Sequence, residues 1–339
     1  MSKIPKDESG LNYQGTSLSE AELHKIKLLL TQFGIHDYCI NHKDGSVDVY
    51  QDVIITDSEL THLPIKFNKA YKSFRYIDCP NLNSLKNSPD YVSENFSCSG
   101  HPLLQSLENG PKHVGVGYEC NSCNLTSLIG SPTKMSENAH FRCSNNLLTS
   151  LVGAPTYLIN SFEAPGNAIT SDEGCPIVSN MLNLGWNQLT ELKNIDLSNI
   201  RSLIIRNNLF DSLESIKGLS LVNSKLWLYA QYNRLTSLKG SPQKCLFLDL
   251  GNNQISSMEG APMIVSNGLS LDHNLLENFE QFPKIRSDGN PQIVICNNPI
   301  YSLGVLDNTE YRSKIFKIVK IKEEIKNRLK IKYIRENLK

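Results

Sequence analysis

The sequence predicts an α/β repeat solenoid, and three features of its 339 residues support this fold class. One short pattern recurs, from Phe141 to Pro155 and again from Leu248 to Pro262. The pattern keeps a polar slot at the same place in its copies, and a proline often follows the last apolar position. Self-similarity at a fixed period is typical of stacked units that bury one continuous core. Such a stack usually serves as a binding surface.

The repeating unit reads apolar-x-apolar-x-x-Asn-x-apolar-x-x-apolar, which is the leucine-rich-repeat pattern, and its length stays near 21 residues. About twelve units follow one another from residue 50 to residue 305. Every unit repeats the direction of the one before it. We therefore expect a horseshoe with one strand per unit and a parallel sheet on its concave face.

The polar slot has a structural explanation. After each strand the chain turns inward, where its backbone N–H and C=O groups cannot reach water. An asparagine amide both donates and accepts hydrogen bonds, so it can satisfy the backbone of its own turn and of the next. The slot is filled by Ser58, Cys79, His101, Cys123, Asn146, Asn167, Asn187, Asn208, Asn233, Asn253, Asn274 and Asn298.

Proline sets the expected conformation of the convex side. It removes a backbone donor and biases the residue before it towards extended geometry. A 21-residue unit also leaves little room for a helix, so we expect an extended convex side. The units that follow Leu192 and Leu213 lack this proline. An irregular segment or a short 3₁₀ turn is expected there.

Both ends of a stack need caps, because the outermost units would otherwise expose apolar faces. Residues 1–46 predict an N-terminal cap in which Ser19 and Glu22 form a capping box ahead of an amphipathic helix. A hairpin about Asp44 and Gly45 is expected to follow the helix. Residues 47–305 then form the leucine-rich-repeat solenoid.

The C-terminal segment, residues 306–339, predicts a basic amphipathic helix. It contains eleven Lys or Arg against five Asp or Glu, a net charge of +6, whereas the whole chain is neutral. One interpretation is a cap on the last unit with lysines facing water. The alternatives are a site for nucleic acid or an acidic partner, and an oligomerising helix.

Composition and cysteine usage limit the possible functions. No apolar run is long enough to span a membrane, and the N-terminus lacks an apolar signal core, so no membrane contact is expected. The nine cysteines include Cys120 and Cys123, whose spacing resembles a metal-binding pair. The repeat register instead places Cys120 in an apolar strand position and Cys123 in the polar slot. We expect reduced, metal-free cysteines, no cofactor and a cytoplasmic location.

The candidate protein-binding surface consists of outward-facing residues in the middle and late units. Aromatic residues and arginine dominate the energetics of protein interfaces, and both tryptophans of the chain fall in this group. Alternatively, some of these rings stack on one another to shield the strands. A smaller charged set in the early units, Arg75, Glu119, Arg142 and Glu163, is expected to be solvated. The candidate residues are Trp186, Arg206, Trp227, Tyr229, Gln231, Tyr232, Phe247, Asp249 and Asp272.

The sequence also resembles a family of known proteins. The segments Asp44–Val49 and Leu63–Lys69, followed by units of Cys-Ser-Asn-Asn-x-Leu-Thr-Ser-Leu-x-Gly-x-Pro, are similar to leucine-rich-repeat proteins encoded by tailed bacteriophages. The similarity covers residues 38–305. The short units also resemble those of bacterial type III effectors, including a family of ubiquitin ligases. That family carries a catalytic domain after its repeats, whereas only about 30 residues follow the repeats here.

These observations favour a non-enzymatic phage protein that binds a host or virion protein through its concave face. No phosphate-binding loop, metalloprotease motif or cysteine with an evident activating partner is present in the sequence. The expected location is the host cytoplasm during infection, or the virion. The alternatives are a nucleic-acid-associated protein that uses residues 306–339, and an effector-like regulator of a host enzyme.

Overall fold

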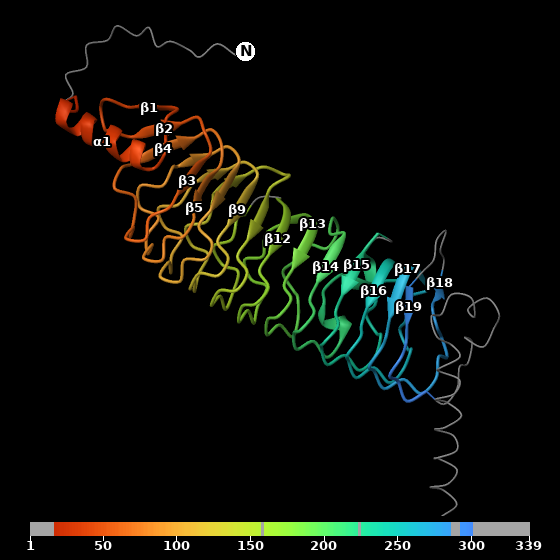
Figure 1. Cartoon of the computed structure of the whole chain (residues 1–339). Helices are drawn as coiled ribbons and strands as arrows, with labels where there is room; N and C mark the ends of the chain where they lie inside the picture. Colours follow the sequence, from red (N-terminus) through yellow and green to blue (C-terminus); the bar gives the residue numbers. More distant parts are fainter. Residues whose placement is uncertain (1–16, 157–158, 223–224, 286–291, 301–339) are drawn as a thin grey trace, which may run out of the picture.

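The computed structural model describes residues 17–156, 159–222, 225–285 and 292–300. They form a parallel-strand β-solenoid of about 11 turns of roughly 21 residues each. Figure 1 shows the turns stacked in chain order along the length of the molecule. The twelve units expected from the sequence ended at residue 305, so the last of them is described only in part. The helix predicted for residues 306–339 lies outside the described residues.

A long sheet of 13 strands runs along the stack. Its strands pair in parallel, as the sequence predicts, because each turn presents the same edge in the same direction to the next. Both β18 and β19 pair with β17 at the C-terminal end. The strands are β3 (Val53–Ile55), β5 (Phe74–Tyr76), β7 (Asn95–Ser97), β9 (Gly117–Glu119), β11 (His140–Arg142), β12 (Ile159–Glu163), β13 (Val178–Asn183), β14 (Ser202–Ile204), β15 (Trp227–Tyr229), β16 (Lys244–Asp249), β17 (Ile264–Ser270), β18 (Lys284–Ile285) and β19 (Gln292–Val294).

A second sheet of six strands lies beside the first turns of the long sheet. The prediction of one strand per unit was therefore wrong for these turns. The segment after each proline-containing corner pairs with its equivalent in the neighbouring turn, as Lys69 and Ala70 do with Tyr91 and Val92. Within the first of these segments, Phe67 and Ala70 face the core and Lys69 is exposed. Pairing satisfies backbone groups that a loop would leave to water. The strands are β1 (Tyr38–Ile40), β2 (Val47–Val49), β4 (Phe67–Ala70), β6 (Tyr91–Val92), β8 (His113–Val114) and β10 (Lys134–Met135).

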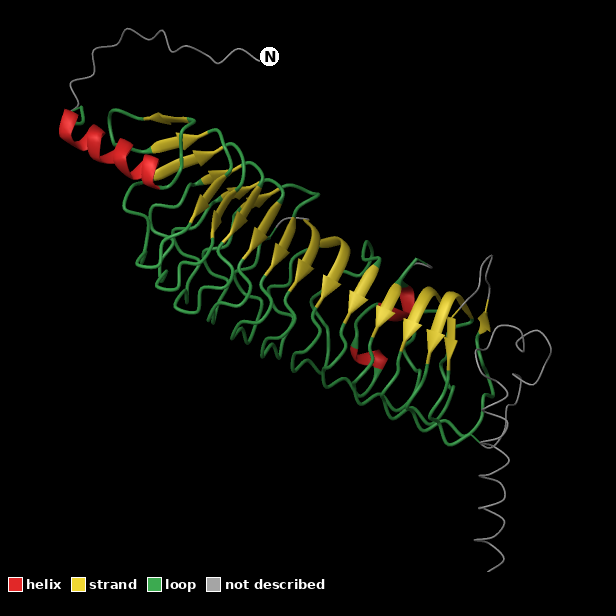
Figure 2. Cartoon of the chain, viewed as in Figure 1, coloured by secondary structure: helices red, strands yellow, loops and turns green. Residues whose placement is uncertain are grey.

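Helical structure is sparse in the described part of the chain, where the only α-helix is α1 (Glu20–Gln32). Ser19 and Glu22 form the capping box expected from the sequence, and Ile26 and Leu30 are buried. Figure 2 shows α1 in red at the N-terminal end of the stack, next to the antiparallel strands β1 and β2. Two 3₁₀ turns, η1 (Leu213–Ser215) and η2 (Leu219–Leu221), occupy the unit whose missing proline predicted an irregularity.

A ladder of polar side chains holds the inner turns together. The amide Nδ2 of Asn208 donates to the carbonyl oxygens of Leu184 and Ile205 at 2.9 and 3.0 Å, and its Oδ1 accepts from the backbone N–H of Leu189 at 2.9 Å. Other asparagines of the slot repeat this arrangement from turn to turn. This confirms the structural role of the slot, although Ser58, expected to begin the ladder, is exposed.

The early units use weaker substitutes in the same slot. The thiol of Cys123 donates to the carbonyl oxygen of Cys98 at 3.2 Å, and Cys79 donates to Ile55 at 3.4 Å. The imidazole Nδ1 of His101 is buried and lies 2.9 Å from the same carbonyl oxygen of Cys98. All nine cysteines of the chain are free thiols in this structure.

Candidate binding surface

The candidate residues on β15 and β16 point away from the core. In the parallel register Trp227 lies opposite Phe247, and Tyr229 lies opposite Asp249. The residues between them, including Leu228, are fully buried. Because side chains alternate along a strand, the apolar positions fill the core and leave the aromatic and acidic side chains on the outer face. We call the nine candidate residues the late-turn surface.

Three aromatic rings of the late-turn surface stack on one another. The rings of Trp227 and Phe247 lie 5.2 Å apart at an interplanar angle of 25°, and those of Tyr229 and Phe247 lie 5.4 Å apart at 41°. All three side chains are partly buried. The alternative drawn from the sequence, in which the rings shield the strands, therefore describes these three residues. They leave less ring surface free for a partner than the sequence suggested.

The exposed aromatics of the late-turn surface sit instead at the end of each strand. Trp186 is 45% exposed and Tyr232 is 54% exposed. Both adopt a left-handed backbone conformation, with φ of 52° and 57°. The residue at this point of the turn, directly before the polar slot, is left-handed in one turn after another. Elsewhere the position holds Asp78, Gly100, Ser122, Asn145, Gly166, Asn207, Asn252, His273 and Asn297.

Arg206 connects the exposed and half-buried parts of the surface. Its guanidinium carbon lies 4.0 Å from the centre of the Trp186 ring, which is a cation–π contact. Gly185 makes room for this arrangement, because a Cβ there would lie 3.3 Å from the Arg206 side chain. The Nε of Arg206 and the Oε1 of Gln231 are both buried without a hydrogen-bond partner. Such groups are costly unless a ligand satisfies them.

Two carboxylates complete the surface. Burial raises the pKa of Asp249, and the negative charge of Asp272 raises it further, although a hydrogen bond from the backbone N–H of Gly251 at 3.2 Å opposes the change. Burial and the negative charge of Asp249 also raise the pKa of Tyr229. Asp272 is better satisfied, since it accepts from the hydroxyl of Ser270 at 2.6 Å.

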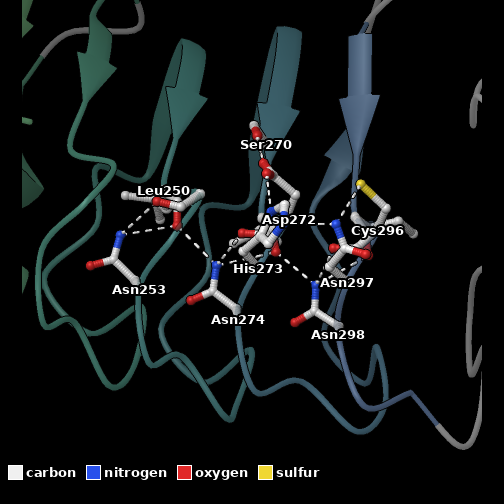
Figure 3. Close-up of polar contacts among 12 residues, drawn as sticks. Leu250, Asn253, Ser270, Asp272, His273, Asn274, Cys296, Asn297 and Asn298 are labelled. Carbon is white, nitrogen blue, oxygen red and sulfur yellow. Dashed lines mark hydrogen bonds and ion pairs between the residues drawn. The ribbon is translucent and has the colours of Figure 1, made fainter.

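Asp272 also belongs to a polar network at the C-terminal end of the long sheet (Figure 3). Its Oδ2 lies 2.8 Å from Nδ1 of His273, and Nε2 of His273 lies 2.8 Å from Nδ2 of Asn297. The same amide of Asn297 lies 3.8 Å from the exposed thiol of Cys296. The sequence offered no partner for Cys296. The network identifies one, but it places an amide, rather than the imidazole, against the sulfur.

Three of the four charged residues of the early units form ion pairs with one another. Arg142 donates from Nε to Glu163 and from a terminal nitrogen to Glu119, both at 2.9 Å. His140 lies 3.5 Å from the same carboxylate of Glu119. These residues are partly exposed, and three consecutive turns place their opposite charges side by side. Arg75 makes no ion pair with another described residue.

The structure thus brings the nine candidate residues onto neighbouring turns from β13 to β17. Their aromatic members form two groups: three stacked, partly buried rings on the strands, and two exposed rings at the strand ends. Sequence reasoning missed the left-handed position that presents Trp186 and Tyr232. A signal was available, since Gly, Asn or Asp recurs directly before the polar slot and the two aromatics interrupt it. It also missed an exposed tyrosine set on the ridge beside the second sheet, where Tyr50 and Tyr71 stack at 4.9 Å.

Other kinds of site receive no support from the described residues. No group of three or more His, Cys, Asp or Glu among them is arranged to hold a metal ion. In the same part of the chain, no helix is long and apolar enough to cross a membrane. The sequence matches no protein-family model, and comparison with curated proteins returns no significant match.

Proposed function

We propose that the chain is a non-enzymatic protein-binding module that engages its partner through the late-turn surface. The observation that carries this proposal is the placement of Trp186 and Tyr232 in left-handed turn positions. A bulky side chain in this conformation costs about 1–2 kcal/mol relative to the right-handed one. Most other turns place Gly, Asn or Asp there, which tolerate the conformation.

Burial in the core does not offset this conformational cost, because both rings are about half exposed. Backbone strain held together with exposed aromatic area is typical of binding sites. The unpartnered Nε of Arg206 comes from the turn between the two rings, and the unpartnered Oε1 of Gln231 comes from the turn of Tyr232. Together they offer a donor and an acceptor to an incoming chain. Tryptophan, tyrosine and arginine are also the residue types that most often dominate interface energetics.

The finer assignment of the module rests on the repeating unit. We place the chain among the leucine-rich-repeat proteins of tailed bacteriophages, with the long sheet on the concave face of a horseshoe and helical caps at both ends. The regular ladder of asparagines and the 21-residue turns support this assignment. The partner is then a host or virion protein, met in the host cytoplasm or in the virion. A nucleic-acid-associated role is the second candidate, because residues 306–339 carry a net charge of +6.

Capture from infected cells with the variant Trp186→Asn, Tyr232→Asn tests the proposal. Asparagine suits the left-handed conformation, so the variant keeps the backbone and removes the rings. We expect the parent to retain a protein that the variant loses. The matched control is Tyr50→Asn, Tyr71→Asn, which removes two exposed aromatics far from the late-turn surface and should retain the partner. Equal retention by all three proteins would contradict the proposal.

A further inference from the structure

The second sheet presents one exposed column of side chains across four adjacent strands. In the parallel register Lys69 lies opposite Tyr91, and Tyr91 lies opposite His113. His113 in turn lies opposite Lys134. All four side chains are exposed, whereas the residue after each of them is buried, because neighbouring side chains of a strand point to opposite faces. We call these four residues the outer column.

The lysines of the outer column lack acidic partners. Neither Lys69 nor Lys134 forms an ion pair with another described residue, and the same holds for the exposed Lys112 on the turn of β8. By contrast, Lys72, on the same turn as Lys69, pairs with Glu94 at 3.3 Å. A row of cationic side chains that the protein leaves unpaired attracts an anionic ligand.

Nearby carboxylates do not balance this positive charge. Asp48 lies opposite Lys69 in the register, but its carboxylate accepts a hydrogen bond from Nδ2 of Asn68 at 2.8 Å and forms no ion pair with the lysine. We counted the charged residues on β4, β6, β8 and β10, together with the residue before each strand. Asp90 is the only carboxylate, and it stands against four lysines, which are Lys66, Lys69, Lys112 and Lys134.

The aromatic members of the outer column keep parts of their ring faces open. The rings of Tyr91 and His113 lie 6.3 Å apart, and their planes are tilted by 38°. Tyr50 and Tyr71, on the adjoining turns, instead stack at 4.9 Å and 6°, so they cover each other's faces. Tyr91 is also 38% exposed. A flat group can therefore stack on the rings of the outer column.

We propose that the outer column binds a single-stranded nucleic acid, with its lysines at the phosphates and with bases stacked on Tyr91 and His113. Basic side chains combined with aromatic rings hold single strands in this way without reading their sequence. A double helix fits less well, because its bases already stack on one another. An acidic peptide would pair with the lysines but would leave the rings unused. The outer column is separate from the late-turn surface, so this inference goes beyond the proposed function.

Fluorescence anisotropy with a labelled oligothymidylate tests the proposal. The probe has about 16 nucleotides, the upper end of common site sizes, and is titrated with the full-length protein at several salt concentrations. Three lysine–phosphate contacts predict a slope of about −2 for the logarithm of the binding constant against the logarithm of the salt concentration. We expect the single strand to bind more tightly than its duplex with oligoadenylate. Absence of binding, or equal binding of the duplex, would overturn the proposal.

Two variants separate the role of the lysines from that of the rings. Lys69→Gln, Lys112→Gln, Lys134→Gln should weaken binding at least about tenfold at 0.1 M salt and remove most of the salt dependence. Tyr91→Ala, His113→Ala should weaken binding at least about fivefold, the loss of one stacked base, and should leave the slope unchanged. Circular dichroism melting verifies that both variants fold.

Two further variants locate the site. Lys217→Gln, Lys244→Gln, Lys284→Gln removes the same number of exposed lysines from the late turns and should bind like the parent. Parent-like binding by either outer-column variant would overturn the proposal. Loss of binding only in Lys314→Gln, Lys317→Gln, Lys320→Gln would also overturn it, because residues 306–339 would then be the site. The titration needs no captured protein, so its outcome is independent of the capture experiment.

Discussion

The guanidinium carbon of Arg206 lies 4.0 Å from the centre of the Trp186 ring, and the two residues come from adjacent turns of the solenoid. The contact holds a strained and exposed tryptophan in place without burying it. It gives the outer face of the long sheet a group that is both apolar and cationic. The proposed binding module requires that this pair of side chains contacts the partner.

Removing the strained rings should not weaken the fold. We expect Trp186→Asn with Tyr232→Asn to unfold at the same denaturant concentration as the parent or at a higher one. Relief of about 1–2 kcal/mol of backbone strain per site offsets the lost cation–π contact of about 0.5–1 kcal/mol. Urea unfolding followed by circular dichroism measures this. A variant that is clearly less stable would show that the rings serve the fold rather than a partner.

The asparagine ladder should dominate local stability. Replacing Asn208 or Asn253 by alanine should cost about 1–3 kcal/mol per site, because buried backbone groups lose their partners. Each amide contacts the backbone of its own turn and of the turn before it. Ser144→Ala, on the outer face, should be nearly silent. Equal shifts in melting temperature for the two kinds of variant would disprove the register described here.

The cysteines should divide into two classes of reactivity. Cys39 and Cys296 are exposed, whereas burial raises the pKa of Cys175 and of Cys245 to about 12. Burial also raises the pKa of Cys120 well above its ordinary value. Thiolate is the reactive form, so a thiol reagent at pH 8 should modify two of the nine groups rapidly and the rest only after unfolding. Fast modification of more groups, or stoichiometric zinc by elemental analysis, would refute this prediction.

Acid should selectively weaken the charged row of the early turns. The imidazole of His140, followed by the guanidinium of Arg142, lowers the pKa of Glu119. A lowered folded-state pKa stabilises the protein above the unfolded pKa of about 4.3, and this stability is lost as the pH falls through the folded value. Glu119→Gln should therefore lower the melting temperature at pH 7. The loss in the free energy of unfolding should be at most about 1 kcal/mol, because the ion pair of Glu119 with Arg142 is partly exposed. The difference from the parent should vanish towards pH 3, and a constant difference would contradict the assignment.

The sequence was sufficient to predict the turn, its length and its parallel stacking. The reason is local: an inward turn needs an amide such as Asn208, and the residues around it must be apolar. The second sheet was not predictable in the same way. Strands as short as Tyr91–Val92 carry no alternation of their own, and they form only because equivalent segments meet across turns.

The candidate surface was predicted in its residues but not in its arrangement. The alternation along β15 and β16 correctly placed Trp227 and Phe247 on the outer face. Their stacking, and the approach of Asp249 to Asp272 over Gly251, depend on the register between turns, which no single unit specifies. The left-handed conformation of Trp186 likewise becomes apparent only when its φ angle is compared with those of the equivalent residues in the other turns.

Hydroxyl-radical footprinting of the protein with its captured partner shows whether the late-turn surface is the binding site. We expect partner binding to protect Trp186, Tyr232 and the stacked rings of Trp227, Tyr229 and Phe247, while Tyr50 and Tyr71 keep the oxidation rate of the free protein. Unchanged oxidation of the late-turn surface, together with protection of the tyrosine ridge or of residues 306–339, would contradict it.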